Sequence, residues 1–399
     1  MKSNRQLKIG LGVILIICIL FLPGCWGKRE VEELAPLLGV GIDLGQKPGT
    51  YLITEQIAEP KQGGATASEV KQWTVSVEVS SAREAYEMVS KITNLIPFMG
   101  SLKVIVIGED AAKAGFNDII DFAQRFSEFR RSMYLLLAKG KAQSLLNTKL
   151  RSGEIPAIFL KSNLEKGENS STFPIVRLGH YLTILGTETT APIIPLAKSI
   201  KSGDEGIEYK ADEKEGEELQ LEGAGVLKGD HLVDFLTDEE TKGYMWLEND
   251  VLHRFINTVG IDESKVNFGG QVLKSTTIYK VKSNNGTMEL HYQINASIAV
   301  DEVMGLKEKL SDTEWLDLLK EAEKRFAKVI QKECELSIQK EKKLGLDFLG
   351  IGRHIEQYNS GYWKTVKDQW EQNIADFPIS LDVKVTIHNS GMSSSSAND

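Results

Sequence analysis

The chemistry most clearly encoded in this sequence lies at Cys25, near the amino terminus. Three basic residues in the first eight positions precede an apolar run of 14 residues, Ile9 to Leu22, a pattern typical of an export signal. Gly24 and Cys25 follow, with Leu22 three positions before the cysteine. In bacterial lipoprotein signals, a cysteine in this position receives an S-diacylglyceryl group and an N-acyl group. We therefore expect signal-peptide cleavage between Gly24 and Cys25, and lipid on Cys25.

Two alternatives to lipidation remain open for this segment: an uncleaved anchor and an ordinary secreted protein. The apolar run is shorter than the roughly 20 residues that cross a bilayer core, so a transmembrane anchor is the weaker interpretation. Pro23 stands where Ala, Ser or a small apolar residue is usual. Each buried methylene contributes about 0.8 kcal/mol, and one acyl chain alone binds a membrane only marginally. Two acyl chains on Cys25 would anchor the protein stably.

The other cysteines predict neither a disulfide nor a reactive thiol. Cys18 lies in the expected signal peptide and Cys25 is the expected lipid site, which leaves Cys334. Apolar residues recur at spacings of three and four from Trp315 to Ile338, and Cys334 falls on this stripe. We expect Cys334 to be a small core residue of a helix.

No further motif predicts catalysis or ligand binding. Gly350 and Gly352 lack the third glycine of a dinucleotide-binding loop, and Lys-Ser or Lys-Thr does not follow Gly345 to Gly350. A Gly-x-Ser-x-Gly nucleophile elbow is absent. The histidines form no metal-binding helical pair, and each is expected to be a surface or hydrogen-bonded residue: His180, His231, His253, His291, His354 and His388. We predict no catalytic residue, metal, cofactor or nucleotide, and no enzyme.

The composition favours a folded body in water. The hydrophobic fraction is 41% and the charged fraction 26%, both ordinary for globular proteins. Loss of residues 1–24 removes three positive charges, so the net charge moves from −9 to about −12. Such a surface is not attracted to DNA, RNA or anionic lipid. A chain of 399 residues is long enough for two or three domains.

The first half of the sequence predicts a mixed α/β unit. A short helix is expected around Glu30 to Ala35, and a helical region over 156–185 with a loop at 167–172. The strand patterns at 102–107 and 133–138 are too apolar to be exposed on both faces. Further strands are expected at 38–42, 51–57 and 73–79, and further helices at 81–93, 109–113, 117–126 and 141–148.

The second half predicts long strands and one long helix. Residues 288–300 are apolar at every even position, and Asn284 to Gly286 is expected to turn this strand back on 271–281 as a hairpin. Ser311 and Glu314 form a capping box for a helix that runs to about Lys343. Trp363 and Trp370 are expected to face the core from one later helix. Strands at 224–228, 231–235 and 381–387 and a helix at 237–246 complete this half.

An acidic segment divides the chain. Residues 204–218 contain eight acidic residues and two lysines without apolar periodicity, which favours a solvated linker over a cation site. We predict an α+β, multidomain protein in which each domain is a largely antiparallel or mixed β-sheet flanked by helices. The expected divisions are a lipoprotein signal peptide (1–24), an N-terminal α/β region that can contain two subdomains (25–203), the acidic linker (204–218), a C-terminal α+β domain (219–390) and a disordered tail (391–399).

Several separated blocks resemble one protein family. The blocks are Cys25 to Leu34, Gly39 to Asp43, Lys103 to Glu109, Glu128 to Arg131, Ala138 to Gly140, Gly223 to Lys228, Leu232, Leu236, Glu239-Glu240, Gly243, Trp246-Leu247, Gly345 to Gly350, Trp363, Trp370, Phe377 and Ile387 to Gly391. In order and spacing they resemble the Ger(x)C family, the lipoprotein C subunits of the nutrient germinant receptors of spore-forming bacteria. Gly27 and Ser127 depart from the family's usual residues.

The resemblance implies a non-enzymatic protein that is needed for spore germination. It implies partnership with two integral membrane proteins, the A and B subunits of the receptor, and a lipid anchor on the outer face of the spore inner membrane. Cys25 is the one functional residue that the resemblance carries over. The alternative is a solute-binding lipoprotein of a transporter, which should show repeated βα units in two hinged lobes.

Overall fold

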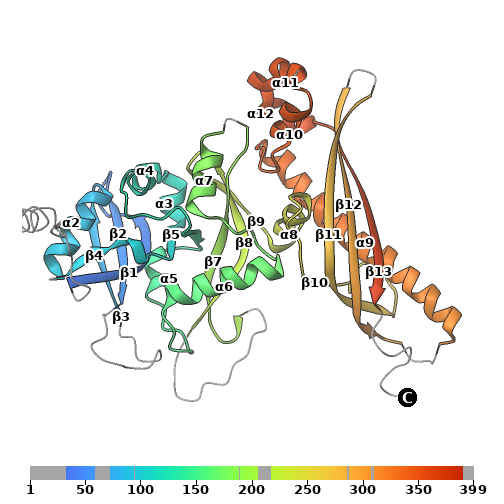
Figure 1. Ribbon diagram of the computed structural model, residues 1–399, viewed down its shortest axis with the longest axis horizontal. Coiled ribbons are helices and arrows are strands. Elements are labelled where there is room, and N and C mark those ends of the chain that lie inside the picture. Colours follow the sequence, from blue (N-terminus) through green and yellow to red (C-terminus); the bar gives the residue numbers. More distant parts are fainter. Residues whose placement is uncertain are drawn as a thin grey trace, which may run out of the picture.

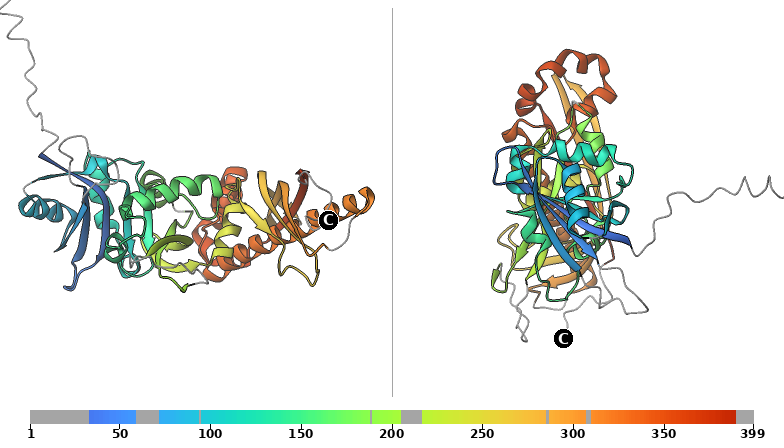
Figure 2. Two further views of the ribbon diagram at one scale, coloured as in Figure 1. Left: turned by 90° about the horizontal axis from the view of Figure 1, so that it is seen from below. Right: turned by 90° about the vertical axis from the view of Figure 1, so that its left-hand side faces the viewer.

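The computed structural model describes residues 33–58, 72–93, 95–187, 189–204, 217–284, 287–306 and 310–389. These residues form two β-sheets with helices packed against them, placed one after the other along the long axis of the molecule (Figures 1 and 2). The first sheet is a large mixed one, and the second has the order β10-β11-β12-β13. The predicted α+β class, with mixed sheets flanked by helices, is confirmed.

The first sheet has the order β3-β2-β1-β5-β6-β7-β8-β9, and β4 pairs with β1. Its centre, β1-β5-β6-β7, is parallel, whereas the pairs at both edges are antiparallel. The strands are β1 (Leu34–Leu44), β2 (Tyr51–Ala58), β3 (Gln72–Val79), β4 (Ile96–Phe98), β5 (Val104–Gly108), β6 (Tyr134–Ala138), β7 (Ile193–Ile200), β8 (Glu218–Lys228) and β9 (His231–Leu236).

Helices cover both faces of this sheet, and every residue of the central strands β5 and β6 is therefore buried. One face packs against α2 (Ala82–Ile92), α3 (Glu109–Ala114), α4 (Asn117–Arg125) and α7 (Leu178–Leu185), with η3 (Met99–Ser101) nearby. The other face packs against α5 (Ala142–Leu146) and α6 (Pro156–Ser170). Gly39 permits this close packing, since a Cβ there would lie 2.9 Å from the Cβ of Ala157 in α6.

The second sheet contains β10 (Phe255–Asn257), β11 (Asn267–Asn284), β12 (Thr287–Met304) and β13 (Ile379–Asn389). β11 and β12 form the predicted antiparallel hairpin, and β13 pairs with β12 in parallel. The even-numbered residues of β12 from Met288 to Val300 are buried under α9 (Asp312–Leu344), which begins with the predicted capping box of Ser311 and Glu314. Figure 1 shows α9 crossing one face of this sheet at an angle to its strands.

The chain between α9 and β13 folds into short helices at one end of the hairpin (Figure 1). These are α10 (Ile351–Tyr358), α11 (Ser360–Val366), η5 (Lys367–Gln369), α12 (Trp370–Asn373) and η6 (Ile374–Asp376). Trp363 and Trp370 are buried with ring centroids 5.3 Å apart in a T-shaped arrangement. Their predicted core position is confirmed, but they lie on two helices that η5 separates, rather than on one.

Helix α8 (Asp238–Leu247) joins the two sheets. Its Trp246 is fully buried in a core that extends from Val226 of β8 to Ile294 of β12 and Phe326 of α9. β8 and β9 follow the predicted acidic linker, yet both pair into the first sheet through β7. The last strand of the first sheet, β9, ends at Leu236, and residues 205–216 lie outside the described residues.

The prediction of a short helix around Glu30 to Ala35 is wrong for its described part. Leu34 and Ala35 begin β1 and pair in parallel with Ile96 and Pro97 of β4. Strand β4, about 60 residues later along the chain, pairs with the backbone of these residues. Tertiary pairing of this kind overrides local helix propensity.

Candidate functional site

The predicted lipid site lies outside the described residues. Gly24 and Cys25 precede Glu33, the first residue that the structure describes, so the structure assigns them no geometry. Among the helices of the described ranges, none combines the length and the apolar character needed to span a membrane. Anchoring at Cys25 stays a prediction from the sequence.

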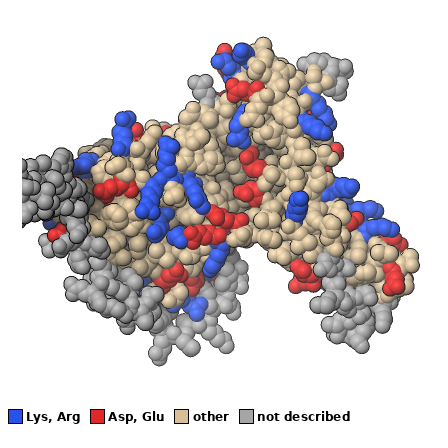
Figure 3. All heavy atoms as spheres, viewed as in Figure 1, with Lys and Arg blue, Asp and Glu red and all other residues tan. Residues whose placement is uncertain are grey.

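A cleft lies at the junction of the two sheets. It has a volume of about 190 Å³ and is lined from one side by His180 of α7 and Thr190 near the start of β7. Glu248 and Asp250, which follow α8, line the other side together with Arg353 of α10. Figure 3 shows acidic and basic side chains at the junction of the two parts. Residues far apart in the sequence thus contribute opposite charges to one cleft.

Burial shifts the protonation of the charged groups in this junction cleft. Burial raises the pKa of Glu248 to about 7, partly offset by the Arg353 guanidinium 3.7 Å from its carboxylate. Burial also raises the pKa of Asp250 and lowers the pKa of His180. The Oγ of Thr190 is buried without a hydrogen-bond partner among the described residues. The cleft therefore offers polar groups to both acidic and basic parts of a ligand or a partner chain.

Two carboxyl groups lie deeper, behind this cleft. Asp347 accepts hydrogen bonds from the backbone N–H groups of Ile351 and Gly352, each at 2.6 Å, and from Trp370 Nε1 at 2.8 Å. Desolvation nevertheless raises the pKa of Asp347 to about 6. Burial, with Asp347 nearby, raises the pKa of Glu341 well above its usual range. These carboxyls hold the start of α10 and have a structural role.

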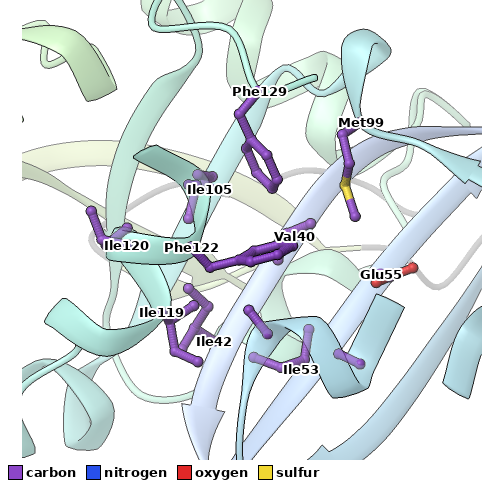
Figure 4. A pocket seen from close by; sticks show the side chains of 13 residues that line it. Val40, Ile42, Ile53, Glu55, Met99, Ile105, Ile119, Ile120, Phe122 and Phe129 are labelled. Atoms are coloured by element: carbon purple, nitrogen blue, oxygen red, sulfur yellow. The ribbon is translucent and has the colours of Figure 1, made fainter. Parts of the chain in front are cut away.

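An apolar pocket lies between the first sheet and helices α2 and α4 (Figure 4). Its cavity of about 30 Å³ has room for roughly two water molecules. Glu55 of β2 is 2% exposed, and its Oε2 has no partner among the described residues. Burial raises the pKa of Glu55 to about 8, so the carboxyl is neutral at pH 7. Figure 4 shows Glu55 at one side of the pocket, whose other labelled lining side chains, among them Val40 and Met99, are apolar.

The structure places the remaining sequence candidates in structural roles. Cys334 is fully buried on α9, as predicted, and burial raises the pKa of its thiol well above the usual value. His354 is buried and stacks on Tyr279 at 3.7 Å between ring centroids. Burial, with the nearby Arg353 charge, lowers the pKa of His354 to about 4. Neither residue has the exposure that a reactive group needs.

Sequence reasoning missed a cluster of Ser380, His291, Asp382 and Glu289 on β12 and β13. The parallel register sets His291 opposite Ser380, so His291 Nδ1 lies 2.8 Å from Ser380 Oγ, and Asp382 lies 3.3 Å from Nε2. The Ser380 hydroxyl donates to Glu289 and is not available to be deprotonated by His291. These residues line neither the junction cleft nor the apolar pocket beside Glu55. The cluster is a cross-strand hydrogen-bond network.

Metal ligands do not gather among the described residues, where no group of three or more His, Cys, Asp or Glu side chains is placed to hold an ion. The face in Figure 3 carries interspersed basic and acidic side chains rather than a field of one sign. Interspersed charges of this kind do not form the basic stripe by which proteins track a nucleic acid backbone.

Two family models cover most of the chain. The spore germination protein N-terminal domain matches residues 27–199. The spore germination B3/GerAC-like C-terminal domain matches residues 222–391. The whole acidic segment, residues 204–218, lies in the interval between the two matches.

Relatives and a solved structure agree with these models. The chain is 27% identical to spore germination protein KC of Bacillus subtilis over 96% of each chain. It is 27% identical to spore germination protein YndF of that organism, covering 98% of this chain and 99% of the relative. The crystal structure of the GerBC protein matches with a TM-score of 0.54 and 20% identity, covering 90% of this chain and all of that chain, and so has a similar fold. The chain therefore belongs to the family of spore germination proteins that combine the GerAC-type N-terminal and C-terminal domains.

Proposed function

We propose that this chain is a lipid-anchored, non-enzymatic subunit of a spore nutrient germinant receptor. The observation that carries the proposal is the similarity to spore germination proteins over nearly the whole chain, from residue 27 to residue 391. The Gly24-Cys25 pair after an apolar run supports the anchor. The subunit acts through contacts with integral membrane A and B subunits on the outer face of the spore inner membrane.

The described side chains support a binding role rather than catalysis. Cys334 and His354 are buried, and the Ser380 hydroxyl is already engaged with Glu289. Charged side chains instead line the junction cleft, where a partner chain can reach them. The division into a region before residue 204 and a domain after residue 218 stays part of this proposal.

The test replaces Cys25 in the spore-forming host. Cys25→Ala should abolish incorporation of labelled palmitate, release the mature chain from the membrane fraction and impair germination with nutrients. Cys18→Ala, in the same apolar segment, is the matched control and should behave as the unchanged chain. If Cys25→Ala spores keep a mature, membrane-bound protein and germinate normally, the anchor is wrong. If tagged protein recovers no A or B subunit from spore membranes, the receptor assignment is wrong.

The solute-binding alternative has one observation in its favour, the junction cleft of about 190 Å³ with Arg353 and Glu248 on its walls. Against it, the two sheets differ in strand order and do not repeat a βα unit as two similar lobes. Calorimetry with amino acids and sugars separates the two functions. Micromolar binding by the purified chain would favour the solute-binding role.

A further inference from the structure

A groove separate from the junction cleft is lined by residues of α8, α9 and the β10 segment. Lys242 of α8, Lys332 and Leu336 of α9, and the β10 segment with Arg254 and Ile256 line it. Its volume is about 220 Å³. The α9 lining residues are Val329, Lys332, Glu333 and Leu336, which lie on one helix face because 329 and 336 are each three or four positions from both 332 and 333.

Arg254 gives this groove a buried cation with unused hydrogen-bond donors. The side chain is 2% exposed, and its Nη2 donates to Glu333 of α9. The other oxygen of Glu333 accepts from Trp246 Nε1 at 2.8 Å, so both carboxylate oxygens are engaged. Arg254 Nε and Nη1 have no hydrogen-bond partner within the described ranges. The Nε–H group and the two N–H groups of Nη1 thus lack an acceptor in those ranges. The Trp246 ring, whose centroid lies 5.6 Å from Cζ, offsets part of the cost of burying this positive charge.

The surroundings of Arg254 combine positive charge with apolar surface. Lys332 is exposed and forms no ion pair with a described residue, whereas Lys242 pairs with Asp238. Two carboxylates also line the groove, Glu239 and Glu333, of which Glu333 is paired with Arg254. Phe255 and Val259 also line the groove and are 52% and 59% exposed. A bound anion would meet the guanidinium and lysine, and an attached apolar group would cover Val259 and Leu336.

We propose that the groove between α8 and α9 binds a small organic anion, with its carboxylate on Arg254 and its apolar part against β10 and α9. Guanidinium groups bind carboxylates through paired N–H donors, and such charge-assisted bonds are stronger than neutral ones. The ligand relieves the cost of the unpaired donors, and Lys332 attracts it to the rim. This site is independent of the lipid anchor and of the proposed receptor partners.

The test titrates the purified full chain with hexanoate in a calorimeter, with hexylamine as the cationic probe of equal chain length. Hexanoate should bind with a dissociation constant on the order of 1 mM, and hexylamine should not bind. Arg254→Lys, which keeps the charge but loses the paired donors, should weaken hexanoate binding about tenfold or more. Lys332→Glu should weaken it several-fold, with the larger effect at low salt.

A matched control variant distinguishes binding in the groove from a general effect of charge. Lys328→Glu changes the same charge one turn away on α9, outside the groove lining, and should leave binding unchanged. Because Lys332 and Lys328 are both exposed, these variants fold even if Arg254→Lys does not. Absence of hexanoate binding to the unchanged chain, equal binding of hexylamine, or equal loss in Lys332→Glu and Lys328→Glu overturns the proposal.

Discussion

Gly243 of α8 lies directly against the backbone carbonyl of Glu333 in α9. A Cβ at position 243 would lie 2.0 Å from that oxygen and 3.0 Å from the Cβ of Ser337. The contact sets how closely α8 approaches α9, and it lies one turn from Trp246, whose indole donates to Glu333. The junction between the two sheets therefore depends on a glycine at this crossing.

Gly243→Ala should lower the free energy of unfolding by about 3 kcal/mol, because the helices must move apart or strain to admit the methyl group. Urea denaturation followed by tryptophan fluorescence measures the change. Gly361→Ala in α11 is the matched control, since the nearest atom there is 3.5 Å away. This control should be neutral or stabilising by up to about 1 kcal/mol, and an equal loss in both variants would contradict the packing argument.

Asp347→Ala should destabilise the chain by about 3 to 5 kcal/mol, since two backbone N–H groups and the Trp370 indole lose their acceptor in the interior. Chemical denaturation gives the value. Glu371→Ala serves for comparison, because Glu371 forms an exposed ion pair with Lys228 that contributes less than about 1 kcal/mol. Similar losses in the two variants would show that the Asp347 network does not hold α10.

Glu55→Gln should change how stability depends on pH. Burial raises the folded-state pKa of Glu55 to about 8, so its stabilising contribution is complete below about pH 4.5. It is lost as the pH rises to about 8, because the unfolded chain releases this proton first. The loss is on the order of 3–6 kcal/mol, and Glu55→Gln should avoid it.

Denaturation of both proteins at pH 5 and pH 9 tests this. The substituted chain should be the more stable of the two at pH 9, with a much smaller difference at pH 5. Glu87→Gln, at an exposed position of α2, should follow the unchanged chain. The free energies of unfolding of the Glu55→Gln and unchanged chains could instead differ by the same amount at both pH values. That result would show that Glu55 does not titrate in this range.

Ser311→Ala should cost about 1 kcal/mol by removing the side-chain cap of α9. The Ser311 hydroxyl accepts from the Glu314 backbone, and the Glu314 carboxylate accepts from the Ser311 backbone at 2.8 Å. Thermal unfolding followed by circular dichroism detects the change. Ser311→Asp keeps an acceptor at the same position and should retain most of the stability; if it loses as much as alanine does, capping is not the cause.

Periodicity was sufficient to predict the elements whose partners lie close in the sequence. The hairpin of β11 and β12 follows from strict alternation and a short turn, and α9 follows from its capping box and apolar stripe. The burial of Cys334 follows from the same stripe. In these elements, local preference and packing act in the same direction.

The start of β1 and the place of β8 depend on pairing between residues far apart in the sequence. Leu34 enters β1 because β4 pairs with it, and β8 joins the first sheet because β7 offers an edge on the other side of the acidic segment. Spacing along the chain carries no information about such partners. The acidic composition of residues 204–218 therefore could not show that the strands on either side of this segment pair with each other.

The α+β class, the resemblance to spore germination proteins and the prediction of lipid at Cys25 all follow from the order of residues along the chain, because each depends on local patterns. Which charged side chains meet depends instead on how the chain folds. Arg353 approaches Glu248, and Arg254 approaches Glu333, across more than 70 residues of chain. Burial then sets their electrostatics, since desolvation acts on side chains that the packed core removes from water.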